Sequence, residues 1–122
     1  MHRSTAPVLL TAAGVVDARG LARGRFADSS GRYSVEGAIQ VALVRRGGTV
    51  REHALTYSEA VLAAETVVAA EGFEAPAGRQ LLSAWSDQAT VEAAVALLED
   101  AADLAEAMAG GDASPARLAS TT

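Results

Sequence analysis

The sequence predicts an all-α fold, a small bundle of four or five helices with a long C-terminal helix and a flexible tail. Apolar residues recur at helical spacing, most clearly over residues 91–108. Helix start or stop signals stand at Ser34, Thr56 and Gly110–Gly111. The one segment that could form a strand is residues 49–55, TVREHAL. Because a lone strand has no partner with which to pair, we interpret that segment as a connection.

The N-terminal half predicts two helices separated by a loop. The first begins near Thr5, tolerates Pro7 in its first turn, and ends at Gly20 or Gly24. The sequence that follows, RGRFADSSGRY, is rich in turn-forming residues and is predicted to be a loop. Ser34 then caps a second helix, which a pair of glycines after its C-terminal arginines brings to an end.

The C-terminal half predicts three further helices. Thr56–Glu59 matches a capping box, so the third helix should begin there and end at Gly72. A short helix is expected around Arg79–Trp85. Thr90 begins the long fifth helix, which carries a narrow acidic strip and is otherwise built from Ala, Val, Leu and Met. A helix that is apolar around most of its circumference is expected to pack on two sides.

The two apolar sides of this last helix also predict self-association. If one side meets the chain's own core, the other is free for a second copy, and a twofold homodimer is the commonest assembly for small proteins. The residues expected at that interface are Val91, Val95, Leu98, Ala102 and Ala105.

Length and composition predict a single domain over residues 1–110, with a flexible tail over 111–122. Half of the chain is apolar but only 4% is aromatic, so the core must consist of Ala, Val and Leu. The chain has no cysteine and two histidines, which excludes disulfides and thiolate catalysis and predicts neither a metal site nor a cofactor. No signal peptide is recognisable and no apolar run approaches the roughly 20 residues of a membrane span, so we expect a cytoplasmic protein.

Charge is distributed unevenly along the chain. Residues 1–51 carry eight arginines and three acidic residues, whereas residues 52–122 carry two arginines and twelve acidic residues. The basic half could dock on the acidic half, pair with a second copy, or present a basic face to an anion. No helix-turn-helix spacing, interleaved aromatics or phosphate-binding loop accompanies the arginines, so nucleic-acid binding is disfavoured.

Two segments resemble a known family. RGRFADSSGRYSVEGAIQVAL is similar to the Gly-x-aromatic, loop and Gly-Ala helix of an uncharacterised family of small actinobacterial helical proteins, and LLSAWSDQATVEAAVALLEDAADLA is similar to that family's second block. The absence of lysine and asparagine also fits a genome of high G/C content. The chain departs from the family at Ser34 and Val35, where a cysteine is common, and at Ser86, where asparagine is common. The resemblance implies a helical fold and no particular activity.

Three residues are candidates for catalysis, each with a structural alternative. Glu36 could act as a general base against an Ala-rich core, or could face the dipole of its own helix. Asp87 could accept a proton, or could hydrogen-bond the backbone ahead of the last helix. His53 could join Glu52, Tyr33 and Tyr57 in an acid–base group, although a lone histidine in a polar connection is usually solvated.

Aromatic side chains are the candidates for lining a ligand pocket between helices. They are Phe26, Tyr33 and Trp85. Trp85 is also the largest apolar anchor that the chain offers to its core.

These observations favour a small non-enzymatic accessory protein that acts by self-association or by binding another protein. The alternative is a small-molecule-acting enzyme or ligand-binding protein of specialised metabolism, with a pocket between helices. The latter should bring Glu36, His53 or Asp87 into one cavity. The former should expose a contiguous apolar patch along Val91–Met108.

Overall fold

The computed structural model describes residues 1–24 and 26–111, which form five α-helices, one 3-10 helix and no β-strand. The elements are α1 (Thr5–Arg19), α2 (Val35–Arg45), the 3-10 helix η1 (Arg51–His53), α3 (Ala54–Ala70), α4 (Leu81–Gln88) and α5 (Val91–Gly111). The predicted all-α fold with a long C-terminal helix is therefore confirmed. The predicted flexible tail lies outside the described residues, apart from Gly111 at the end of α5.

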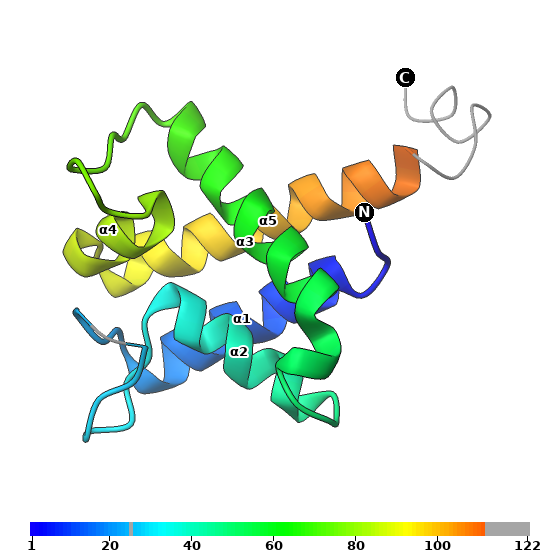
Figure 1. The fold of residues 1–122 in the computed structure, drawn as a ribbon, viewed down its shortest axis with the longest axis horizontal. Coiled ribbons are helices and arrows are strands. Elements are labelled where there is room, and N and C mark those ends of the chain that lie inside the picture. Colours follow the sequence, from blue (N-terminus) through cyan, green and yellow to red (C-terminus); the bar gives the residue numbers. More distant parts are fainter. Residues whose placement is uncertain (25, 112–122) are drawn as a thin grey trace.

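The longest helix, α5, packs against α1 and α3 (Figure 1). Its most extensive contacts are with α1, which runs beside it in the opposite direction, so that the N-terminus lies near the far end of α5 (Figure 1). Helix α3 crosses α5 and also contacts α1, while α2 packs on α1. The short α4 leads directly into α5 and contacts both α2 and α3. Helices α2, α3 and α4 therefore meet at one end of the bundle.

Several predicted helix ends are confirmed by their local geometry. The hydroxyl of Ser34 accepts a hydrogen bond from the Gly37 backbone N–H at 3.0 Å, and this bond caps the start of α2. The hydroxyl of Thr90 accepts in the same way from the Ala93 N–H at 3.1 Å at the start of α5. Gly20 follows the end of α1 with a φ of 87°, a conformation that favours glycine.

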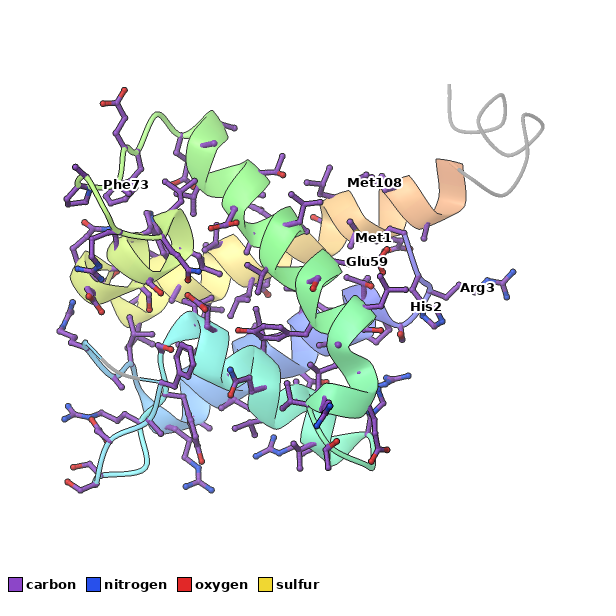
Figure 2. All side chains as sticks on the ribbon, in the orientation of Figure 1. Met1, His2, Arg3, Glu59, Phe73 and Met108 are labelled. Carbon is purple, nitrogen blue, oxygen red and sulfur yellow. The ribbon has the colours of Figure 1, made fainter. Side chains whose placement is uncertain are left out.

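The predicted capping box at Thr56 is wrong. Helix α3 begins two residues earlier, at Ala54, because the 3-10 turn η1 runs straight into it, and no side chain caps this end. Glu59, the acidic residue of the supposed box, instead accepts from the His2 backbone N–H at 3.0 Å and from the Thr5 hydroxyl at 3.1 Å. Figure 2 shows Glu59 of α3 beside the N-terminal residues. Through these two hydrogen bonds, its carboxylate links the start of α1 to α3.

Helix α4 spans Leu81–Gln88 rather than the expected Arg79–Trp85. Its N-cap residue, Gln80, makes no capping hydrogen bond through its side chain. The Glu65 carboxylate of α3 accepts instead from the Leu82 backbone N–H at 3.2 Å, and so satisfies a donor in the first turn of α4. The start of this helix is therefore fixed by a residue from another helix.

The core is formed largely by small side chains. Alanine is the commonest of the buried apolar residues, and the largest fully buried side chains are leucines and an isoleucine. On α5, the buried face contacts α1 and α3 of the same chain, as its predicted two-sided packing requires. Its acidic residues, from Glu92 to Glu106, are exposed on the opposite face. The predicted wheel of this helix is thus confirmed.

This wheel predicts opposite effects for two adjacent substitutions on α5. Leu98 is fully buried, so Leu98→Asp would place an unpaired charge in the core and lower the free energy of unfolding by several kcal/mol. Glu99 is exposed, so Glu99→Gln should change the free energy of unfolding by less than about 0.5 kcal/mol. Urea denaturation of the two variants measures both values. Equal midpoints would contradict the assignment of the two faces.

Candidate ligand-binding cleft

A cleft opens where α2, α3, α4 and the connection between α1 and α2 meet. It consists of two adjoining cavities, one of about 300 Å³ and one of about 600 Å³, and both are lined by Phe26 and Gln80. The smaller cavity also contacts Ser83 and Asp87, and the larger one contacts Glu36. Volumes of this size are typical of sites for small organic molecules.

One wall of the cleft depends on Gly37, because only glycine leaves room there for the α1–α2 connection. A Cβ atom at this position would lie 2.0 Å from the carbonyl oxygen of Phe26 and 2.9 Å from its carbonyl carbon. The same carbonyl accepts a hydrogen bond from the Ser34 N–H at 3.0 Å. The backbone of Phe26 is therefore seated directly on the first turn of α2. Its ring remains 50% exposed and lines the cleft.

The other end of the α1–α2 connection is held by Arg23 and Asp87. The Arg23 guanidinium donates to the backbone carbonyls of Asp87 and Ala89, where α4 gives way to α5. The Asp87 carboxylate accepts from the Gly24 N–H and from the Arg79 guanidinium, each at 2.7 Å. The hydrogen bond from Arg79, followed by that from Gly24, holds the pKa of Asp87 below its ordinary value of 3.8. Asp87 thus holds in place the part of the α1–α2 connection that lines the smaller cavity.

Glu36 is the buried carboxylate of the cleft. It lies in the first turn of α2, where the helix dipole favours an anion, and only 5% of its surface is exposed. One carboxylate oxygen accepts from the Ser83 hydroxyl of α4, and the other accepts from the Tyr57 hydroxyl of α3 at 3.3 Å. Gln40, one turn later on α2, donates to the Tyr57 hydroxyl at 3.4 Å. Glu36 therefore connects all three helices around the cleft.

The pKa of the Tyr57 phenol also reflects the negative charge in this part of the cleft. Burial raises the pKa of its phenol, and the hydrogen bond from Gln40 opposes that shift. The negative charges of Glu36 and Glu65 raise the pKa further, because a phenolate would be repelled by both carboxylates. The phenol therefore stays protonated and remains a hydrogen-bond donor to Glu36.

The candidates from sequence fall into two groups. Phe26, Glu36 and Asp87 all line the cleft. Trp85 is 6% exposed and belongs to the core, and Tyr33 is half-buried against that core, its backbone bridged to Leu21 and Ala27. Neither aromatic ring lines the two cavities.

His53 lies apart from the cleft. One nitrogen of its ring lies 2.6 Å from the backbone carbonyl oxygen of Gly47, in the connection between α2 and α3. It lines another cavity, of about 460 Å³, together with His2 and Glu52. Tyr57, the tyrosine that the sequence placed near His53, contacts Glu36 instead. His53 and Glu52 therefore share a cavity, but Tyr57 does not join them.

Three of the residues predicted for a homodimer interface are buried inside the chain itself. Leu98, Ala102 and Ala105 are at most 2% exposed and belong to the core, so their side chains are not available to a second copy. Val91 and Val95 are half-buried against the same core. Along the described part of α5, Met108 is the one large apolar side chain that is exposed. The contiguous patch expected of an interaction protein is absent from that helix, and the homodimer stays a prediction.

The sequence gives no indication of three further residues at the cleft, Ser83, Glu65 and Gln80. Each comes from a helix or turn that is distant in sequence from Glu36, and each lines the cleft or contacts it only after α3 and α4 pack on α2. Serine, glutamate and glutamine are common on exposed helix faces, so no local pattern singled them out. Within the described residues, no group of three or more His, Cys, Asp or Glu side chains could hold a metal ion, and no helix is long and apolar enough to cross a membrane.

The chain matches the sequence model of a known family. The sequence model of a family of unknown function, DUF6197, matches residues 1–104, which include every residue of the cleft named above. The chain belongs to this family. No curated protein and no solved structure matches the chain. The DUF6197 family has no assigned activity, and the cleft is the feature of the structure that bears on function.

Two glycine substitutions test the seating of Phe26. Gly37→Ala should force the connection off α2 and lower the free energy of unfolding by about 1–3 kcal/mol. Gly14 of α1 is the matched control, because it is exposed and a Cβ there meets nothing within 4 Å. Gly14→Ala should raise the free energy of unfolding by roughly 0.5–1 kcal/mol, as alanine does in helices. Thermal and urea denaturation measure both effects. A stabilising Gly37→Ala would contradict the close approach.

The low pKa of Asp87 predicts how its contribution to stability changes with pH. A carboxylate whose pKa is lower in the folded state stabilises the fold above its unfolded pKa, and this stabilisation disappears as pH falls through the folded pKa. Asp87→Asn should therefore be less stable than the wild type at about pH 7 and approach it at about pH 3 or below. Urea midpoints measured across this range test the prediction. A difference that is the same at every pH would show that the charge of Asp87 contributes nothing.

Proposed function

We propose that this protein binds a small organic molecule in the cleft between α2, α3 and α4. The observation that carries the proposal is Glu36, a buried carboxylate that lines a cavity of about 600 Å³. Most glutamates are exposed, and a buried one requires hydrogen bonds or charge partners to offset the loss of water. Glu36 is hydrogen-bonded to two neutral hydroxyls and also lines the cavity.

The apolar part of the cleft supports the same proposal. Phe26 is 50% exposed and Leu62 is 57% exposed, and both line the larger cavity. Sites for small molecules combine apolar and aromatic walls with a few fixed polar groups. Here the fixed groups are Glu36 and the Tyr57 hydroxyl, whose positions are set by contacts among three helices. A bound molecule would cover apolar surface and find its polar partners already oriented.

Other functions considered from the sequence have less support. Arg23 and Arg32 of the basic half contact the carbonyl of Asp87 and the carboxylate of Asp28, which leaves them less available to a nucleic acid. Self-association and binding to another protein stay untested predictions, as do the cytoplasmic location and the actinobacterial source. Glu36, Ser83 and Tyr57 are polar groups suited to orienting a ligand, and we propose binding rather than a particular reaction.

A fragment screen by two-dimensional NMR tests the proposal. Fragments that bind in the cleft should shift the amide resonances of Phe26, Glu36 and Gln80. Leu62→Ala should weaken their binding by several-fold to about tenfold, because the ligand loses apolar contact. Leu10→Ala on α1 is the matched control, since Leu10 is 53% exposed and lies outside the cleft. A screen in which no fragment shifts the cleft resonances, or in which both variants lose affinity equally, would refute the proposal.

A further inference from the structure

The chemistry of the larger cavity narrows the class of ligand. Building on the proposed binding function, we infer that the cleft takes an organic cation, an ammonium group carried on an apolar or aromatic body. The inference follows from the juxtaposition of Glu36, Glu65 and Tyr57 with the exposed side chains of Phe26 and Leu62 around one cavity.

Among the described residues, the charged groups that line this cavity are all carboxylates. They are Glu36 of α2 and Glu65 of α3, and no Arg, Lys or His side chain lines it among the described residues. Glu36 receives hydrogen bonds only from the neutral hydroxyls of Ser83 and Tyr57 within the described chain. Each carboxylate oxygen can accept more than one hydrogen bond, so both oxygens keep capacity for a further donor. A cation would supply the charge partner that a buried carboxylate favours.

Glu65 is the second carboxylate that lines this cavity, and it is held in place by a backbone hydrogen bond. One of its oxygens accepts the Leu82 backbone N–H at 3.2 Å, which fixes the carboxylate against the start of α4. The side chain remains half-buried and lines the cavity. The negative charges of both glutamates act on the Tyr57 phenol and help to raise its pKa. The phenol and the cavity beside it therefore lie in a region of negative electrostatic potential.

The exposed apolar side chains of the cavity indicate the uncharged part of the ligand. The exposed ring of Phe26 and the exposed side chain of Leu62 would be covered by an alkyl or aryl group. The aromatic rings of Phe26 and Tyr57 could also attract an ammonium group through cation–π contact. An anionic ligand fits less well. Arg79 lines only the smaller cavity and already pairs with Asp87 at 2.7 Å.

Three small molecules of similar shape and different charge test the inference on the unmodified protein. They are 2-phenylethylammonium, the neutral 2-phenylethanol and the anionic phenylacetate, titrated at neutral pH by calorimetry and by NMR. The cation should bind in the cleft about tenfold or more tightly than either control, and added salt should weaken its binding. Equal or tighter binding of the alcohol or the acid in the cleft would overturn the inference and leave the proposed function standing. Failure of the cation to bind there would also overturn it, and the fragment screen would still decide whether the cleft binds ligands at all.

Carboxamide variants test the two carboxylates individually. Glu65→Gln and Glu36→Gln keep the size and an acceptor oxygen but remove the negative charge, so each should weaken binding of 2-phenylethylammonium about tenfold. Glu99→Gln on the exposed face of α5 should leave the affinity unchanged. Glu65 is only half-buried, so its variant remains informative if Glu36→Gln does not fold. Unchanged affinity in either variant, provided that the variant folds, would overturn the inference.

Discussion

The small side chains of the core set how closely the helices of this protein approach one another. Alanines on α1, α3 and α5 are fully buried where these helices meet, and larger side chains at the same positions would hold the helices apart. Close approach compensates for the small apolar area that each alanine buries, because many backbone and Cβ atoms come into contact. The position of α3 across α5, and therefore the position of the cleft beside it, depends on this packing.

A second close approach determines the wall of the cleft. Gly37 admits the backbone of Phe26 onto the first turn of α2, where the capping residue Ser34 also bonds the Phe26 carbonyl. Ser34 is itself next to Val35, whose N–H donates to the Ser86 hydroxyl of α4 at 3.1 Å. The first turn of α2 therefore holds the connection on one side and α4 on the other. Ser34 and Gly37, two small residues at the start of α2, therefore bring together the segments that form the cleft.

Glu36 combines a structural part with its proposed part in ligand binding. Its carboxylate links α3 and α4 to α2 through Tyr57 and Ser83, so it contributes to holding the helices in place. The same carboxylate lines a cavity whose other charged residue, among those that the structure describes, is also acidic. A cation bound there would pair with a charge that the fold already positions, and little reorganisation would be needed on binding. The proposed ligand class thus follows from an arrangement that the packing itself requires.

The sequence by itself determined the helices and most of their ends. The helical periodicity of apolar residues predicted α5 and its buried face. The caps at Ser34 and Thr90 could be predicted because a capping side chain is adjacent to the turn it stabilises. It also selected Phe26, Glu36 and Asp87, which all line the cleft. Tertiary structure decided what these residues contact. The starts of α1 and α4 are held by Glu59 and Glu65, whose partners lie far away in the chain, and no local pattern encodes such contacts. For the same reason the sequence assigned Leu98, Ala102 and Ala105 to a partner. An apolar helix face looks identical whether its own chain or a second copy covers it, and only the packing of α1 and α3 shows which one does.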